Sequence, residues 1–551
     1  MKNKILPTAV KTLISAAIIF LMFWFELPAV NLRSEGFWSF LVRSIIVCIV
    51  VYAFGRIIAI AKDIKSARGY QKGSIKELLR SLGKPVMVTL AVVAVMIAAS
   101  AVFSIVGSQL FNASGYNKLL VLEDGDFSAD VAELNMTQIP VVDRDTAVRL
   151  GARKMGNMED LVSQFDISEE YTQINYKGRP TRVTPLCYGD PIKWFNNQSH
   201  GLPAYIMVDM VTQETTLVRL DEGMKYSSGE YFMRNIYRYL RFHYPTKIFD
   251  NITFEIDENG TPYWVASTVS YRIGFWSGRD IGGAVLVNAI TGESNYYKLD
   301  DIPTWVDQVY SSDMIIEQLI YNGKYRSGFF NSIFGQKGVL QPTDGYNYLA
   351  IDDDVWLYTG ITSVMSDESN VGFVLVNLRT KDARYYSLPG AEEYSAMSSA
   401  EGQVQNLGYK STFPILLNVG DRPTYFMSLK DDAGLVKMYA FVDVEQYQIV
   451  GTGSSPNEAR TNYIAKLGKV DTSSESETPT EKSVSGKISG IESAVVSGNT
   501  KYYFMLQGDS SIYIADISQN SMLPFMGAGA EVELTYTGNE TRTVTSIKLA
   551  K

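Results

Sequence analysis

The chain has 551 residues, of which 46% are apolar and 20% are charged, an ordinary average for globular proteins. This composition excludes a chain that is disordered or collagen-like over most of its length. Residues 1–110 hold 13 of the 50 Lys and Arg but 4 of the 59 Asp and Glu, so a head of net +9 precedes a body of net −18. Because an acidic body repels phosphate backbones, we expect no nucleic-acid binding.

Three apolar stretches in the head predict membrane-spanning helices. They are Thr12–Val30, Phe37–Ala61 and Val86–Leu110. Each is long enough to cross about 30 Å of hydrocarbon, since a helix rises about 1.5 Å per residue. The alternative for the first stretch is a cleaved signal peptide, but its apolar run is longer than such signals usually have.

The distribution of Lys and Arg predicts the orientation. The loop 62–84 carries seven basic residues, whereas the first interhelical loop has only Arg33. Basic loops stay in the cytoplasm. We therefore expect a multi-pass cell-membrane protein with a cytoplasmic N-terminus, a cytoplasmic loop 62–84, and an extracytoplasmic body from about residue 111.

Two ionisable residues fall near the outer ends of the first two predicted helices. Glu26 and Arg43 are costly at such a depth unless they are paired or reach water. One interpretation is an ion pair that clamps the helical hairpin. The other is that both side chains extend separately to the membrane interface.

Cysteine and histidine usage limits the chemistry of the body. Cys48 lies in the second predicted helix and Cys187 in the body, so no disulfide can form within the body, which is typical of Gram-positive surface proteins. His200 and His243 are too few for a three-histidine zinc site, and no serine-hydrolase or nucleotide-binding motif is present. We expect no catalytic residue, no metal and no cofactor.

Acidic residues leave two alternatives open. Asp257 lies in the turn Asp257-Glu258-Asn259-Gly260, Asp354 ends the run Asp352-Asp353-Asp354, and Asp280 is a third candidate acid. Most such clusters are solvated turns, but carboxylates brought together in space can bind calcium or hydrolyse glycans. A carboxylate-dependent glycan hydrolase therefore remains an alternative, and loss of glycan cleavage on Asp→Asn substitution would support it.

A pattern recurs along the body. Ala284–Leu299 matches Phe373–Leu388 at a spacing of 89 residues, Tyr205–Leu220 is a third copy and Ala440–Val450 a weaker fourth. The common kernel of the four copies is Val208-Asp209, Val287-Asn288, Val376-Asn377 and Val442-Asp443. Each kernel predicts a hairpin in which Asp or Asn opens the turn by bonding its amides, a structural role.

Helical stretches accompany these hairpins. They are predicted at Tyr231–Tyr239, Val306–Ile320, Ala391–Gln405 and Pro456–Leu467. Each unit is therefore expected to be an antiparallel sheet covered by one helix. Between the strands of one unit, residues 266–282 form a long excursion.

Two segments carry a family resemblance. Gly260-Thr-Pro-Tyr263-Trp-Val265 and Val287-Asn288-Ala-Ile-Thr291-Gly292-Glu293 resemble the strand and hairpin motifs of PepSY-like domains. The resemblance covers about 143–467. It implies tandem non-catalytic modules of the kind found in protease propeptides and in envelope proteins that bind or restrain partners.

The tail is predicted to be a separate small domain. Residues 471–482 lack apolar groups and indicate a flexible linker. Five short strands follow, with a helical turn between the third and fourth, in an order that looks like an OB-fold barrel. The strands are predicted at Val484–Val496, Tyr502–Leu506, Ile512–Ile517, Val532–Tyr536 and Val544–Leu549.

The expected fold class is α+β, with three transmembrane helices, tandem PepSY-like sheet-plus-helix repeats and an OB-like barrel. The expected domains are 1–110, 111–470, the linker 471–482, and 483–551. The leading functional hypothesis is a non-catalytic binding or scaffold protein of the bacterial envelope, whose partners are other envelope proteins and the membrane lipid. The runner-up is a sensory or regulatory accessory subunit that responds to an external ligand.

Overall fold

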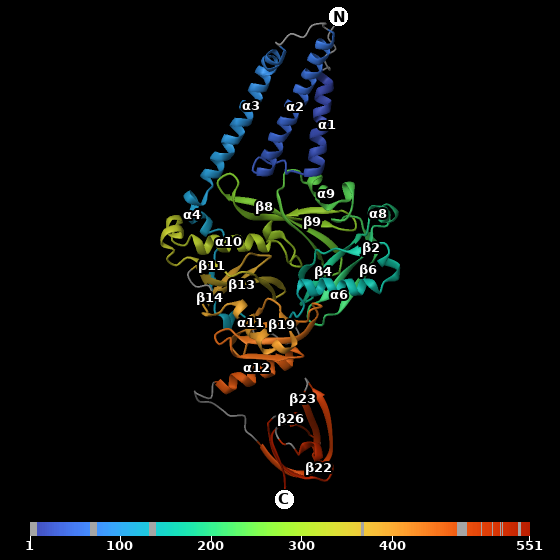
Figure 1. Ribbon diagram of the computed structural model, residues 1–551, viewed down its shortest axis with the longest axis vertical. Helices are drawn as coiled ribbons and strands as arrows, with labels where there is room; N and C mark the ends of the chain where they lie inside the picture. Colours follow the sequence, from blue (N-terminus) through green and yellow to red (C-terminus); the bar gives the residue numbers. More distant parts are fainter. Residues whose placement is uncertain are drawn as a thin grey trace. The chain divides into compact units, whose positions relative to one another are not determined.

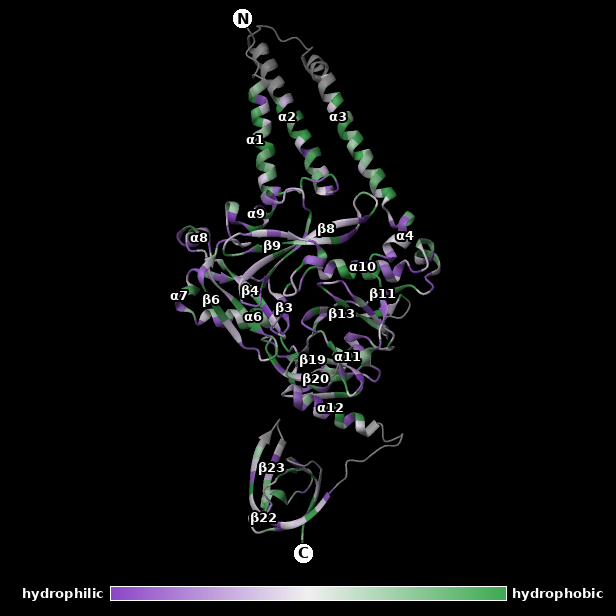
Figure 2. Cartoon of the chain, turned by 180° about the vertical axis from the view of Figure 1, so that it is seen from behind, coloured by the Kyte–Doolittle hydropathy of each residue, from purple (hydrophilic) through white to green (hydrophobic). Residues whose placement is uncertain are grey.

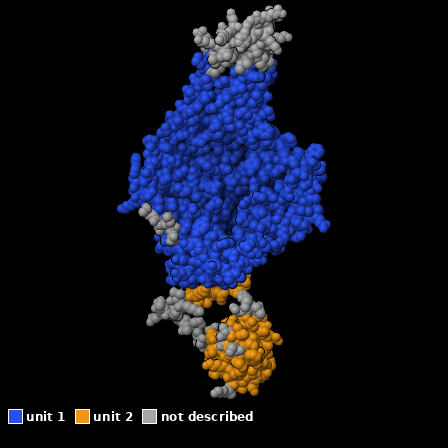
Figure 3. Space-filling model, in the orientation of Figure 1, with its two compact units in different colours: residues 1–452 blue, residues 453–551 orange. Residues whose placement is uncertain are grey.

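The computed structural model is a mixed α+β protein with two compact units, residues 1–452 and 453–551 (Figures 1 and 3). It describes residues 8–66, 74–131, 139–364, 369–470, 482–496, 499–509, 511–517, 520, 522–537 and 541–550. Part of the predicted basic loop and nearly all of the predicted linker lie outside these residues. The expected α+β class is confirmed.

Three helices form the N-terminal part of the first unit, as expected. They are α1 (Thr8–Glu26), α2 (Glu35–Ser66) and α3 (Ser74–Val106). Each contains a stretch of 18 to 20 residues that is long and apolar enough to cross a membrane, and Figure 2 shows that hydrophobic residues, drawn in green, predominate along these helices. Their apolar residues are largely exposed within the protein, which fits helices whose surroundings are lipid.

Four antiparallel meanders make up the rest of this unit, and in each the second and third strands are central. The first is β3 (Thr172–Tyr176), β4 (Arg179–Tyr188), β5 (Leu202–Asp209) and β6 (Thr215–Met224); the second is β7 (Phe249–Ile256), β8 (Pro262–Ile273), β9 (Ser277–Asn288) and β10 (Ser294–Tyr297). The third is β12 (Asn347–Ile351), β13 (Asp354–Ser363), β14 (Ser369–Asn377) and β15 (Ala383–Tyr386); the fourth is β18 (Ile415–Val419), β19 (Arg422–Lys430), β20 (Val436–Asp443) and β21 (Val450–Gly453).

Short elements extend these sheets or connect them. The added strands are β1 (Glu123–Asp124), β2 (Phe165–Ile167), β11 (Leu340–Pro342), β16 (Gly390–Ala391) and β17 (Lys410–Ser411). The short helices are α4 (Gln109–Asn117), α5 (Phe127–Asp130), α7 (Glu159–Val162) and α8 (Pro191–Asn197).

A helix precedes each meander. These helices are α6 (Arg144–Gly156), α9 (Ile236–His243), α10 (Ser312–Lys324) and α11 (Glu393–Gln403). The sequence patterns placed the starts of α9 and α10 five or six residues too early, because Asn235 and Ser311 cap these helices through their side chains. The helix α6, which contacts the first sheet, was not predicted.

The largest core lies around α10. Met314, Ile315 and Leu319 of this helix pack against side chains of both the second and the third meander, including Leu286 and Leu357. The two sheets therefore share one helix and one core. This shared core joins the second and third repeats into one packed body.

The long excursion 266–282 is a continuation of the β8–β9 hairpin, and its tip contacts α2, α3 and the loop between α1 and α2. The ring of Phe275 stacks on Phe103 of α3 with centroids 4.5 Å apart, and Trp276 meets Trp38 of α2 edge-on at 5.8 Å. Arg33 donates from Nε to the Phe275 carbonyl at 2.8 Å. The second repeat is thereby fastened to the helices.

The second unit contains α12 (Pro456–Val470), which was expected to belong with the repeats, and a closed five-stranded barrel, which was expected. The barrel strands are β22 (Lys482–Val496), β23 (Asn499–Leu506), β24 (Ile512–Asp516), β25 (Glu531–Thr537) and β26 (Thr541–Leu549). They close in the order β22-β23-β24-β26-β25 through a parallel β24–β26 pair. A short turn of helix, Leu523–Phe525, lies between β24 and β25.

The shared core predicts a large difference between two neighbouring residues of α10. Leu319 is 2% exposed whereas Ile320 is 40% exposed. Leu319→Ala should lower the free energy of unfolding by about 3 kcal/mol because it leaves a cavity in the core. Ile320→Ala, the matched control, should change it by less than about 1 kcal/mol. Chemical denaturation of the purified full chain measures both, and equal effects would contradict the assigned core.

Candidate functional site

A polar cavity of about 710 Å³ lies at the centre of the first unit. The first strands of three meanders, β3, β7 and β12, supply part of its wall through residues such as Thr172, Thr253 and Tyr348. Phe413, which precedes β18 of the fourth repeat, and the beginnings of α6 and α10 complete the wall. The repeats therefore meet around one cavity. Its lining of hydroxyl, amide and charged groups suits a polar ligand.

A second cavity, of about 620 Å³, adjoins the first along β7. The two cavities share lining residues, among them Arg144 and Asp250. The far end of the second cavity is lined by Glu26 and Leu27 at the end of α1. The polar space at the centre thus extends to the base of a membrane-length helix.

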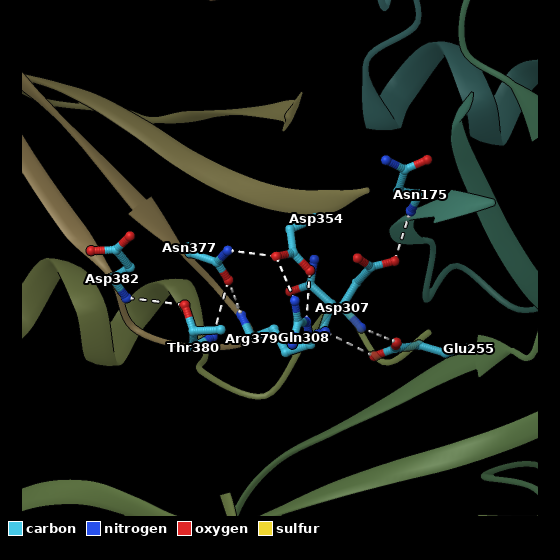
Figure 4. Close-up of polar contacts among 9 residues, drawn as sticks. All are labelled: Asn175, Glu255, Asp307, Gln308, Asp354, Asn377, Arg379, Thr380 and Asp382. Atoms are coloured by element: carbon cyan, nitrogen blue, oxygen red, sulfur yellow. Dashed lines mark hydrogen bonds and ion pairs between the residues drawn. The ribbon is translucent and has the colours of Figure 1, made fainter. Parts of the chain in front are cut away.

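Two buried carboxylic acids lie beside the central cavity (Figure 4). Glu255 of β7 accepts hydrogen bonds from the backbone N–H groups of Asp307 at 2.8 Å and Gln308 at 3.2 Å, and from the hydroxyl of Thr253 at 2.9 Å. Asp307 accepts at Oδ2 from the backbone N–H of Asn175 in β3 at 2.7 Å. The pair therefore links the first repeat, the second repeat and the segment before α10.

The two acids hold protons more tightly than they do in water. Burial raises the pKa of Glu255 to about 7. Burial, and then the charge of Glu255, raise the pKa of Asp307 well above its ordinary value. Glu255 has donors directed at both oxygens, whereas the buried Oδ1 of Asp307 has no hydrogen-bond partner among the described residues. We therefore assign the retained proton to Asp307 Oδ1.

The predicted repeat kernels occupy equivalent positions in the four meanders. Val208, Val287, Val376 and Val442 are all buried. The Oδ1 atoms of Asp209, Asn288 and Asn377 each accept two backbone N–H bonds in the following turn, and Asp443 accepts one from Gln446. Gln213, Gly292 and Lys381 have positive φ at the same point of the first three turns. This turn therefore forms with or without glycine.

In the first, third and fourth repeats, the other side-chain atom of the kernel residue bonds the start of the second strand. Arg179 donates to Asp209 at 2.9 Å in the first repeat, and Arg422 to Asp443 at 3.0 Å in the fourth. In the third repeat the direction of the hydrogen bond is reversed, because Asn377 donates from Nδ2 to Asp354 at 2.8 Å. A hydrogen bond at this point is therefore kept, although the kernel residue accepts it in two repeats and donates it in the third repeat.

Glu26 and Arg43 lie together in the structure. Nη2 of Arg43 is 2.7 Å from Oε2 of Glu26, so the hairpin of α1 and α2 contains this ion pair. Glu26 also lines the second cavity. The ion pair therefore stands between the helical hairpin and the polar space of the body.

The three acids proposed for glycan hydrolysis have separate partners. Asp280 pairs with Arg272 at 3.0 Å and with Lys381 at 2.7 Å. Asp354 forms a two-bond pair with Arg379 at 2.6 and 2.7 Å, and Asp257 bonds the amides of its own turn. Among the described residues, no group of three or more His, Cys, Asp or Glu side chains could hold a metal ion.

Sequence patterns did not identify Glu255, Asp307 or Arg182 as site residues. Arg182 lies on β4, lines the central cavity and is 6% exposed. Each of these residues stands in an ordinary alternating strand or loop pattern, so no local signal distinguishes it. Their burial results from the packing of separate repeats.

Comparison with known proteins adds no family or relative. No protein-family model matches the chain, and no curated protein matches it. The site must therefore be interpreted from its own geometry.

The buried acid pair predicts a pH dependence of stability. Because the pKa of Glu255 is raised from 4.5 to about 7, the folded state binds more protons than the unfolded state between these values. The free energy of unfolding should therefore fall as pH rises from about 4.5 to about 7.5, by about 3 kcal/mol, since each tenfold change in proton affinity is worth about 1.4 kcal/mol. Asp307 acts in the same direction.

Denaturation of the full chain at a series of pH values measures this slope. Glu255→Gln should flatten the slope because it removes the titrating group. Glu293→Gln, an exposed change in the turn after β9, should leave it unchanged. A slope that survives Glu255→Gln in full would contradict the role of this carboxyl.

Proposed function

We propose that the protein is a non-catalytic binding or scaffold protein of the bacterial cell envelope, of Gram-positive type, anchored by α1, α2 and α3. The observation that carries the proposal is the central polar cavity, framed by equivalent strands of successive repeats. In this proposal the repeats are PepSY-like modules and the C-terminal barrel is OB-like. The closing order of the barrel and the repeated turn geometry support this assignment.

The state of the acidic residues supports binding rather than catalysis. Glu255 and Asp307 are buried, so a glycan cannot reach them without opening the core. Asp280 and Asp354 are held in ion pairs. A glycoside hydrolase needs two accessible carboxyl groups on opposite sides of the scissile bond.

An exposed apolar patch on α8 and the turn Phe232–Arg234 supports protein partners. We define the patch as the exposed side chains Ile192, Phe195, Phe232 and Met233. Trp194 links the two segments through ring contacts with Tyr231 and Phe232. Contiguous exposed apolar groups of this kind mark interaction surfaces.

A sensory or regulatory accessory subunit is the second candidate function. The contact between the second cavity and the end of α1 favours it, because Arg241 donates from Nε to the Leu27 carbonyl at 2.8 Å. A ligand in the cavity would then act directly on the base of a membrane helix. A conformational response of the loop 62–84 to such a ligand would distinguish this function from scaffolding.

Capture of envelope partners tests the leading proposal. In-cell crosslinking followed by affinity capture of the full chain should recover a near-stoichiometric envelope protein. Phe195→Ser combined with Phe232→Ser should reduce its yield at least tenfold, whereas Leu407→Ser, at an exposed apolar residue outside the patch, should not. Loss of the partner from a chain lacking residues 471–551 would assign the contact to the tail. Recovery of the chain alone would contradict scaffolding.

The proposed orientation is also testable. Starting from a chain with Cys48→Ala and Cys187→Ala, single cysteines are introduced as Lys72→Cys and Ser474→Cys. On intact cells, a membrane-impermeant maleimide should label position 474 but not position 72, because basic loops stay in the cytoplasm. Labelling of position 72 alone would show that the orientation is opposite to the one proposed.

A further inference from the structure

Arg182 is the buried cation of the central cavity, and no carboxylate among the described residues hydrogen-bonds its guanidinium, although the charges of Asp143 and Asp145 act on it. Its guanidinium makes one hydrogen bond, from Nη2 to Oε1 of the neutral Gln173 at 3.2 Å. Its Nε has no hydrogen-bond partner among the described residues. Burial lowers the pKa of Arg182, which is the expected direction for a cation removed from water.

The two partly buried acids on the cavity wall are already compensated. Asp143 accepts from Lys430 at 2.6 Å and from the backbone N–H of Thr146 at 2.9 Å. Asp250 pairs with Arg279 and accepts from the Ser311 hydroxyl at 2.6 Å. The remaining acids of the lining, Asp145 and Asp313, are exposed at the beginnings of α6 and α10. The deepest cation of the cavity is therefore the one that no carboxylate among the described residues contacts through a hydrogen bond.

A buried, unpaired guanidinium is costly unless an anion completes it. Arg presents a planar fork that matches the oxygens of a carboxylate or a phosphate. The neighbouring Gln173 also has a buried Nε2 without a partner among the described residues, so the same wall offers a second donor. The site therefore has the chemistry of an oxyanion pocket.

The other lining residues of the cavity indicate which class of molecule would bear the anionic group. Hydroxyl groups of Ser312 and Thr172 and the rings of Tyr346 and Tyr348 face the same cavity. Such groups suit a molecule that is rich in hydroxyls and has faces for aromatic contact. A volume of about 710 Å³ accommodates a small molecule of this class.

We infer that the central cavity binds a sugar-like molecule that carries a carboxylate or phosphate, with Arg182 as the residue that pairs with the oxyanion. This inference rests on the proposed binding function and names the class of ligand for its cavity. The carboxylate and the phosphate share the same recognition by the guanidinium, and the probes below distinguish them.

Isothermal titration of the full chain in detergent, with glucuronate, glucose 6-phosphate and uncharged glucose as probes, tests the inference. We expect binding of at least one anionic sugar, with at least tenfold weaker binding of glucose. Arg182→Met should weaken the anionic sugar at least tenfold. Arg182→Lys keeps the charge but loses the planar fork, so it should bind the anionic sugar with intermediate affinity. Intermediate binding by this variant would show that the loss in Arg182→Met does not come from misfolding alone.

Arg219→Met is the matched control because Arg219 lies on β6 of the same meander but is exposed, paired with Asp160 and outside the cavity lining. It should leave the affinity for the anionic sugar unchanged. Binding of neither anionic sugar to the unsubstituted chain, or equal binding by Arg182→Met and Arg182→Lys, would overturn the inference. If an envelope partner is still captured from the same preparation, the proposed scaffold function is supported even though the ligand inference has failed. Failure of the ligand inference can therefore be distinguished from failure of the proposed function.

Discussion

The architecture depends on one hydrogen-bonded turn that recurs in the four meanders. The kernel residue, such as Asp209 or Asn377, fixes the turn with one side-chain atom and the start of the second strand with the other. This contact sets the register between strands, and a slip of one residue would turn the preceding buried valine to the opposite face. Because the meanders share the register, their first strands are equivalent, and three of them frame the central cavity.

The second repeat differs from the others in one feature, and this feature joins the body to the membrane helices. Its central hairpin is longer than in the other repeats, with β8 and β9 of 12 residues each. The added length ends in Phe275 and Trp276, which pack against Phe103 and Trp38. A segment that looks like an interruption of the repeat in sequence is therefore its point of attachment, and an aromatic contact of this kind is stable next to the membrane interface.

Local patterns predicted the elements, whereas the site depends on non-local packing. Apolar length identified the three helices, and strand alternation identified the barrel. The sequence Thr-Phe-Glu-Ile around Glu255 reads as an ordinary half-exposed strand, yet the first repeat covers its polar face and buries the carboxyl. The recurrence of Arg-Pro-Thr at Arg179 and Arg422 was a usable signal for equivalent strand starts. No comparable signal exists for Arg182, since its burial involves several separate segments.

The polar centre of the body stabilises the fold less than an apolar core of the same volume would. The core around α10 is mainly apolar, whereas the centre of the repeats holds two buried acids of raised pKa and a buried cation that no carboxylate among the described residues hydrogen-bonds. Apolar residues of similar volume usually stabilise a fold as well as or better than buried charges do. The cost of the acid pair is reduced by protonation and by backbone donors. Among the described residues, Arg182 has one hydrogen bond to a neutral amide and the charges of Asp143 and Asp145, neither of which bonds it directly, so an external anion would supply the direct partner that its guanidinium lacks.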